Sequence, residues 1–133
     1  MRIDIFFQGI HAHASRDVRM SLINLAIAAE ASLANKVNTS AKQKGIASSR
    51  LKRVLRFDFL KQIHEGSREL TGKSFKDEHP DEYGWIRTLW IAREHLAHGK
   101  DPRIEMADGK VRDVILEDIP NFIRAVHALV WWD

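Results

Sequence analysis

The stretch WIRTLWIAREHLAHGK, which spans Trp85 to Lys100, decides the expected fold. Its apolar residues recur at helical spacing, and this pattern predicts an amphipathic helix with one buried face. Gly99 is placed to end that helix, because glycine adopts the left-handed conformation after a last helical turn without steric cost. The residues just before this glycine include four polar side chains, Arg93, Glu94, His95 and His98. The end of this helix is therefore the first place to look for function.

The polar side chains fall on different sides of the predicted helix. Glu94 and His98 are four residues apart and share a face, whereas Arg93 and His98 are five apart and diverge by about 140° around the axis. Arg93 and His98 therefore meet only if the arginine reaches around the helix or the last turn loosens at Gly99.

The sequence REHLAHG, from Arg93 to Gly99, fits a pattern of an arginine, a polar residue, three variable residues and a histidine. It resembles the signature of the HEPN superfamily, small all-α domains found in bacterial toxins, abortive-infection systems and RNA-cleaving effectors. The resemblance implies an endoribonuclease that uses neither a metal nor another cofactor and acts as a homodimer, with both motifs lining one cleft. It assigns phosphate binding to Arg93, proton transfer or 2′-hydroxyl positioning to His98, and the orientation of one of them to Glu94. Many members have Asn or Asp in that slot, so Glu94 is a departure from the family pattern.

The resemblance also implies a biological setting, a toxin or phage-defence ribonuclease with RNA as substrate. An antitoxin or a nucleotidyltransferase is then a candidate partner protein. The alternative function is a non-catalytic HEPN-like module for dimerisation, nucleic-acid binding or regulation. In that case Arg93 is a structural ion-pair partner of Glu94 or another carboxylate, and His98 is a helix C-cap. A helical DNA-binding regulator is a weaker hypothesis, because the loops predicted around the basic helix are too long for a tight helix-turn-helix.

Four residues are candidates for nucleic-acid contacts. His95 and Lys100 flank the motif, and Arg50 and Arg53 lie in a basic segment earlier in the chain. Cationic side chains that follow a phosphate backbone supply much of the affinity for nucleic acids. The alternative for the two arginines is a solvated helix face, and the alternative for His95 is a surface or interface histidine.

Composition limits the class of protein. A chain of 133 residues with 44% hydrophobic and 29% charged residues predicts one globular domain, residues 1–133. The net charge of +3 is compatible with an RNA partner without requiring one. The sequence contains no cysteine, which excludes disulfides, cysteine-based zinc sites and thiol nucleophiles. No apolar run approaches the roughly 20 residues that cross a bilayer, so we expect a cytoplasmic protein that does not enter a membrane.

The remaining segments predict a mainly all-α fold, an antiparallel bundle of about four to five helices. We expect residues 1–14 to form a loose arm, in which His11 and His13 are too few for a metal site. An apolar stripe predicts a helix over residues 15–38, and a polar segment, 38–49, predicts a loop. A second helix is expected from Ser48 or Ser49 to Glu65, and the glycine-containing segment 66–84 is expected to be a connector.

The last third of the chain predicts two further elements. The polarity of residues 103–115 alternates around Asp108-Gly109, which indicates a small β-hairpin resting on the helices. A final helix is expected to begin at Asp118 or Ile119, because Pro120 suits a first helical turn. The tryptophans that follow it, Trp131 and Trp132, are interpreted as core or interface anchors.

Overall fold

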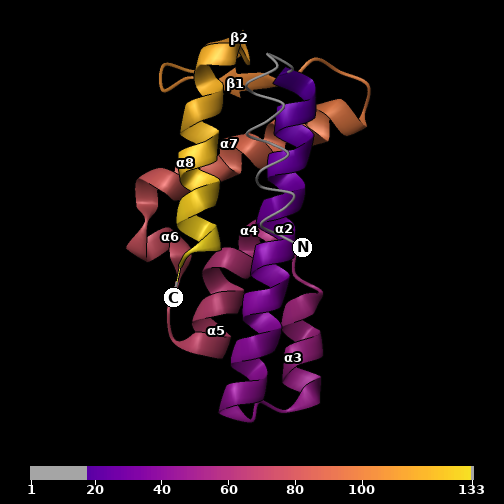
Figure 1. Ribbon diagram of the computed structural model, residues 1–133, viewed down its shortest axis with the longest axis vertical. Coiled ribbons are helices and arrows are strands. Elements are labelled where there is room, and N and C mark those ends of the chain that lie inside the picture. The colour runs from indigo at the N-terminus through magenta and orange to yellow at the C-terminus, as the bar shows by residue number, and fades with distance from the viewer. Residues whose placement is uncertain (1–17, 133) are drawn as a thin grey trace.

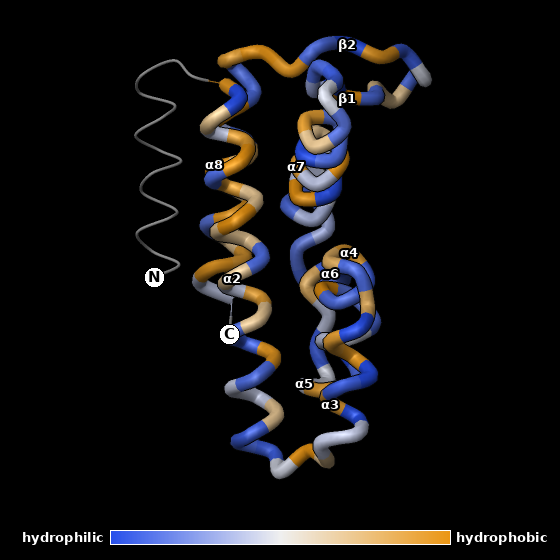
Figure 2. The backbone as a smooth tube through the Cα atoms, turned by 90° about the vertical axis from the view of Figure 1, so that its right-hand side faces the viewer, coloured by the Kyte–Doolittle hydropathy of each residue, from blue (hydrophilic) through white to orange (hydrophobic). Residues whose placement is uncertain are grey.

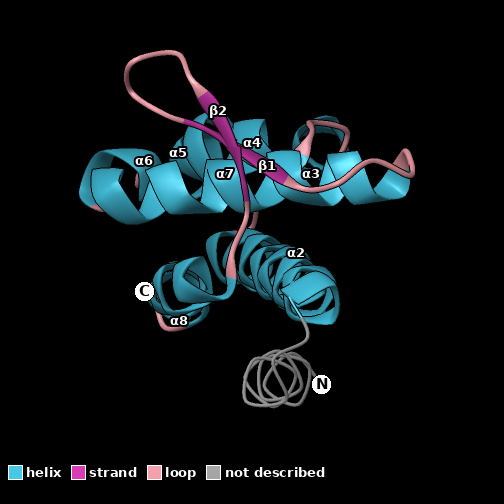
Figure 3. Ribbon diagram, turned by 90° about the horizontal axis from the view of Figure 1, so that it is seen from above, coloured by secondary structure: helices cyan, strands magenta, loops and turns pink. Residues whose placement is uncertain are grey.

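Helices in two layers make up the computed structural model, which describes residues 18–132. One layer contains α2 (Val18–Lys44) and α8 (Ile119–Val130), as the view from above shows (Figure 3). The other layer contains α3 (Ser48–Leu55), α4 (Phe59–Lys61), α5 (Ser67–Thr71), α6 (Phe75–Glu78) and α7 (Pro80–Ala97). A hairpin of β1 (Arg103–Glu105) and β2 (Val111–Asp113) lies above the ends of α7 and α8 (Figure 1). The expected mainly α fold with a hairpin near residues 103–115 is confirmed.

The long helix α2 carries the apolar stripe that the sequence predicts. Its buried residues are Ser21, Leu22, Leu25, Ala26, Ala28, Ala29, Ser32, Leu33, Val37 and Ala41. These side chains cover more than one face, because α8 packs along α2 on one side and α7 crosses it on another. Small side chains such as those of Ala26 and Ala29 let the neighbouring helices approach closely.

The loop predicted over residues 38–49 is wrong for most of its length. The helix continues to Lys44, because Ala41 extends the buried stripe of α2 by another turn. The polar residues of segment 38–44 lie on the solvent side of the helix and do not form a loop. Gly45, with a φ of 64°, then ends the helix, and the chain turns into α3 by Ser48.

The single helix expected from Ser48 or Ser49 to Glu65 is also wrong. Helix α3 ends at Leu55. The carboxylate of Asp58 then accepts a hydrogen bond from the Lys61 N–H (2.9 Å) and caps α4. A π-helical segment, Gln62–Gly66, follows and brings Gly66 against α3. A β carbon at Gly66 would lie only 2.9 Å from Cγ1 of the buried Val54, so the close approach of these segments depends on glycine.

The connector expected over residues 66–84 is largely helical. It contains α5, which ends at Gly72 with a φ of 79°, and α6, which Ser74 caps through its hydroxyl. Pro80 then occupies the first turn of α7, so this helix begins five residues before Trp85. The many charged residues in this segment are the exposed sides of short helices.

The hairpin returns the chain from α7 to α8. Ile104 pairs with Arg112 in an antiparallel register, and the connecting loop has Gly109 at a φ of 82°. The loop closes where the Met106 N–H donates to the Lys110 carbonyl oxygen (2.7 Å). Ile104 is buried, so one strand is anchored in the core.

A bidentate ion pair joins the hairpin to the start of α8. Both terminal nitrogens of Arg112 donate to Asp118, at 2.8 and 2.7 Å, and the Ile115 N–H donates to the same carboxylate at 2.9 Å. Burial alone would raise the pKa of Asp118, but the hydrogen bonds from Arg112 and the Ile115 N–H lower it below its ordinary value. The carboxylate is therefore ionised over the physiological pH range and holds the hairpin onto the helix.

The directions of the helices follow from these connections. Figure 1 shows α2 running down the molecule, α7 returning obliquely upward, and α8 running down beside α2. Helices α2 and α8 are therefore parallel neighbours, whereas α7 runs against both. The hydropathy of the two layers is shown in Figure 2, where apolar residues recur along each helix. Apolar side chains from both layers and the hairpin form one core.

Two predictions concern residues before Val18, which is the first residue that the structure describes. The N-terminal arm with His11 and His13, and the start of the first helix at residue 15, lie outside the described residues. Within residues 18–132, no helix combines the length and the apolar character needed to span a bilayer.

Replacing Gly66 should destabilise the fold. We expect Gly66→Ala to lower the free energy of unfolding by about 1–3 kcal/mol, because the new methyl group meets buried Val54. The matched control is Gly84→Ala in α7, where the added carbon would meet nothing within 4 Å apart from its chain neighbours and the backbone of its own helix. That change should raise stability by up to about 1 kcal/mol, because alanine favours a helix. Urea unfolding of the two variants measures both effects, and equal changes would contradict the close contact at Gly66.

The Asp118 carboxylate should make stability depend on pH in acid. Its pKa is lowered in the folded protein, so its contribution is present above the unfolded pKa of about 3.9 and is lost as pH falls through the folded pKa. Asp118→Asn should cost about 1–3 kcal/mol at pH 7, and the difference from the native protein should shrink below about pH 4. Asp113→Asn, at an exposed pair with Arg103, is the control and should change stability by less than about 1 kcal/mol. Urea unfolding between pH 7 and 3 measures these differences. A difference between Asp118→Asn and the native protein that stays constant over this range would contradict a stabilising role of the ionised Asp118 carboxylate.

Candidate functional site

The end of α7 is built by a backbone motif that orients the side chains before it. The Lys100 N–H donates to the His95 carbonyl oxygen (2.8 Å), and the Gly99 N–H donates to the Leu96 carbonyl oxygen (3.1 Å). Gly99 has a φ of 71°, which favours glycine at this position. These bonds form a Schellman motif, with His98 as the helix C-cap. The helix therefore ends just before Gly99, as expected, and His98 is the last residue before the turn.

Arg93 and His98 both approach the carboxylate of Glu94. The Arg93 Nη1 atom donates to Oε1 of Glu94 at 3.1 Å, and Nε2 of His98 lies 3.9 Å from Oε2 of the same residue. The side chain of His98 is 71% exposed, and that of Arg93 is 36% exposed. The guanidinium reaches around the helix, so the divergence of about 140° between these positions does not keep the two groups from one carboxylate.

Two further residues hold Arg93 in place. Its Nη2 atom lies 3.4 Å from Oε1 of Glu30 on α2, and its guanidinium carbon lies 4.7 Å from the centroid of the Trp90 ring. Trp90 in turn stacks on the buried Phe59, with ring centroids 4.8 Å apart. Cation–π stacking and two carboxylates therefore restrain the guanidinium between α2 and α7.

His95 faces a different part of the surface. Its Nδ1 atom accepts a hydrogen bond from the Arg103 N–H (3.2 Å), so the neutral ring carries its proton on Nε2. His95 lines a hollow of about 450 Å³ together with Gly99, Lys100, Asp101 and Arg103. It also lines a smaller hollow, of about 200 Å³, between α7 and the hairpin. The bond from Arg103 to His95 thus couples the helix end to β1.

Lys100 extends the basic character of this helix end. Its side chain makes no ion pair or hydrogen bond in the described part of the chain. The neighbouring Asp101 is bound by Arg19 at 2.6 Å. The hollow beside His95 therefore offers a cation next to a carboxylate that is already neutralised.

Arg50 and Arg53 are not brought to this helix end. They lie on α3, at the opposite end of the molecule in Figure 1. Arg50 donates to the Glu69 backbone oxygen (2.6 Å) and contacts its carboxylate at 3.4 Å, and Arg53 pairs with the same carboxylate. These contacts join α3 to α5, which gives the two arginines a structural role independent of any nucleic acid.

Two contacts of Arg93, with Trp90 and with Glu30, were not predicted from the sequence. Trp90 lies three residues before Arg93, a spacing that places both on one helix face, so this pair was open to sequence reasoning. Glu30 lies on another helix, and only the packing of α2 against α7 brings it to Arg93. In the described part of the chain, no three His, Asp or Glu side chains are grouped to hold a metal ion.

Comparisons of the chain with protein-family models, with curated proteins and with solved structures found no match.

Proposed function

We propose that this protein is a metal-independent endoribonuclease of the HEPN type, in which Arg93 and His98 act on one phosphate of an RNA strand. The observation that carries the proposal is the shared approach of both side chains to the Glu94 carboxylate. A carboxylate presents two anionic oxygens, as a phosphodiester does. A phosphate near the position of these oxygens would lie within reach of the guanidinium and the imidazole together.

The proposed reaction uses the ribose of the substrate as nucleophile. The 2′-hydroxyl oxygen bonds to the adjacent phosphorus while its proton passes to a base, and the bond from phosphorus to the 5′-oxygen breaks. The leaving oxygen takes a proton from an acid, which yields a 2′,3′-cyclic phosphate and a 5′-hydroxyl end. His98 supplies one proton transfer, and the Arg93 guanidinium stabilises the additional charge on the phosphorane.

One subunit offers one imidazole at this position, and the reaction needs two proton transfers. The second group would be Glu94, or His98 of a second copy of the chain. The exposed apolar residues Ile23 and Ile27 on α2 support the second arrangement. With Glu30 they fall within about 60° around the helix, so a copy that covers them would lie beside the ion pair of Arg93.

The two carboxylates around Arg93 favour a second candidate, a non-catalytic HEPN-like module for dimerisation or nucleic-acid binding. A phosphate can replace the Glu94 contact only if the guanidinium gives up a bond of 3.1 Å within its own helix. If that exchange is too costly, Arg93 serves to brace α7 against Glu30 of α2. A mass of about one chain, 15.3 kDa, by light scattering would contradict the dimer in both candidates.

The cleavage assay tests the enzyme directly. Purified protein is incubated with mixed RNA in EDTA, beside the His98→Ala and Arg93→Ala variants. We expect cleavage that leaves cyclic-phosphate ends and falls by about 10²–10⁴-fold in His98→Ala, the usual contribution of a general acid or base. His98 is largely exposed, so its removal should leave the fold intact, and circular dichroism checks this.

His127→Ala is the matched control, because this histidine is exposed on α8 and lies outside the motif. It should cleave RNA within about twofold of the native rate. Cleavage that persists in His98→Ala would contradict the assignment of the site. Intact RNA with the native protein would contradict the enzyme and favour the binding module.

A further inference from the structure

A basic groove lies on a different side of α2 from Arg93. It has a volume of about 460 Å³ and lies between the second half of α2, the turn after α5 and the end of α8. Three lysines line it, Lys36, Lys44 and Lys73, together with hydroxyl and amide side chains and the indole of Trp132. The described lining residues include no carboxylate. We call this feature the lysine groove.

Two ammonium groups of the lysine groove donate hydrogen bonds to backbone oxygens. Lys44 donates to the Thr71 backbone oxygen at 2.9 Å, and Lys36 donates to the Trp132 backbone oxygen. A carbonyl oxygen accepts a hydrogen bond but leaves the positive charge in place. Lys73 makes no side-chain ion pair or hydrogen bond in the described part of the chain. Lys44 and Lys73 therefore place positive charge in the groove, which attracts anions.

The wall that carries Lys73 is fixed by hydrogen bonds. The Thr71 hydroxyl donates to the Ser67 carbonyl oxygen (2.7 Å) and accepts from the Lys73 N–H (3.2 Å). The hydroxyl of the buried Ser67 donates to the Lys73 carbonyl oxygen (2.9 Å). Gly72, at a φ of 79°, makes this turn. The backbone that carries Lys73 is therefore preorganised, which lowers the cost of binding a ligand.

The end of the groove is fixed as well. The ring of Trp132 packs edge-on against Phe75, with centroids 5.5 Å apart, and its Nε1 atom donates to Glu78 at 3.2 Å. Along the α2 wall, the side chains of Thr39, Ser40 and Gln43 make no hydrogen bond in the described part of the chain. The groove thus combines charge with unused polar groups and an apolar end.

We propose that the lysine groove binds a small ligand that carries a chain of phosphates, and that a nucleoside triphosphate is the class that fits it. The ammonium groups would contact the phosphates as point charges, and the hydroxyl and amide groups of α2 would bond to the sugar or the base. The volume lies within the range of roughly 300–1,000 Å³ that is typical of small-molecule sites.

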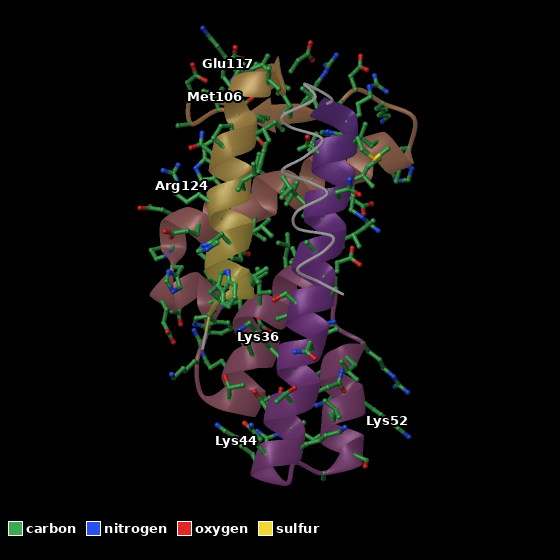
Figure 4. The ribbon with its side chains drawn as sticks, in the orientation of Figure 1. Lys36, Lys44, Lys52, Met106, Glu117 and Arg124 are labelled. Atoms are coloured by element: carbon green, nitrogen blue, oxygen red, sulfur yellow. The ribbon has the colours of Figure 1, made fainter. Side chains whose placement is uncertain are left out.

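The arrangement of the lysines favours a small ligand over an RNA strand. Lys36 and Lys44 are eight residues apart, about 12 Å along the axis of α2, and Figure 4 shows both projecting from the same side of that helix. Lys73 comes from the facing wall. The positive charges therefore surround one hollow rather than forming a row along the surface.

The lysine groove is separate from the Arg93 site. Lys36 follows Glu30 by six residues on α2, a rotation of about 240°, so the two residues face different ways. Ligand binding in the groove therefore does not depend on the proposed ribonuclease activity.

Binding is tested by isothermal titration without divalent cations, with ATP, GTP, inorganic triphosphate, adenosine and a single-stranded RNA oligonucleotide as probes. We expect ATP or GTP to bind more tightly than inorganic triphosphate and adenosine not to bind. Lys44→Gln and Lys73→Gln should each weaken nucleotide binding by at least about fivefold, because each removes one charge-assisted contact. The His98→Ala variant should bind nucleotide as the native protein does, which separates this result from the cleavage assay.

Lys52→Gln is the matched control, because Lys52 is exposed on α3 and projects from the other side of the molecule in Figure 4. It should change affinity by less than about twofold. Equal losses in Lys52→Gln and Lys73→Gln would overturn the proposal, because binding would then follow net charge alone. The absence of nucleotide binding at millimolar concentration, or tighter binding of RNA than of nucleotide that Lys73→Gln abolishes, would also overturn it.

Discussion

The packing of α2 against α7 and α8 is the contact on which the rest of the structure depends. Small buried side chains of α2, among them Ala26, Ala28 and Ala29, allow two helices to approach it at once. Glu30 follows Ala29 directly, so the same turn that is buried in the core places a carboxylate at the edge of the interface. That carboxylate meets Arg93 of α7. The position of the candidate catalytic arginine is thus a consequence of core packing.

The two basic regions of the molecule differ in how their charge is balanced. At the end of α7, the Arg93 guanidinium has two carboxylate partners. Among the described residues that line the hollow beside His95, Asp101 is the one carboxylate, and Arg19 binds it. In the lysine groove, three ammonium groups gather without a carboxylate among the described lining residues. A phosphate at the helix end would therefore have to replace a carboxylate contact of Arg93, whereas an anion in the groove would displace no carboxylate from the described lining residues. Neither property follows from the net charge of +3.

Sequence patterns predicted the elements whose signals are local. Helical spacing predicts the stripe of α2, turn chemistry predicts the hairpin around Gly109, and the fixed φ of Pro120 predicts the start of α8 at Ile119. The segment from residue 48 to 84 was mispredicted, although its two caps are local. Asp58 and Ser74 each accept a hydrogen bond from the N–H three residues later, a spacing that was open to sequence reasoning. The π-helical segment that ends at Gly66 packs closely against Val54 of α3, and this contact joins residues 12 positions apart, which no helical spacing predicts.

The contacts of the candidate site also fall into local ones, which the sequence predicted, and long-range ones, which it did not. The pairing of Glu94 with His98 follows from their four-residue spacing, and the Schellman motif follows from Gly99. The contact of Arg93 with Glu30 joins residues 63 positions apart, which no local pattern predicts. The bonds that tie Arg50 and Arg53 to Glu69 are long-range too, so the sequence did not predict that these residues join α3 to α5. Their contact with a nucleic acid stays a prediction.

The most direct measurement of the central claim is a nuclear magnetic resonance titration with an RNA oligonucleotide whose 2′-hydroxyls are replaced by hydrogen, so that it binds without being cleaved. The side-chain resonances of Arg93 and His98 should shift together and saturate at the same oligonucleotide concentration, because one phosphate contacts both. Shifts confined to the other basic residues, or different saturation points for the arginine and the histidine, would contradict a shared phosphate site at the end of α7.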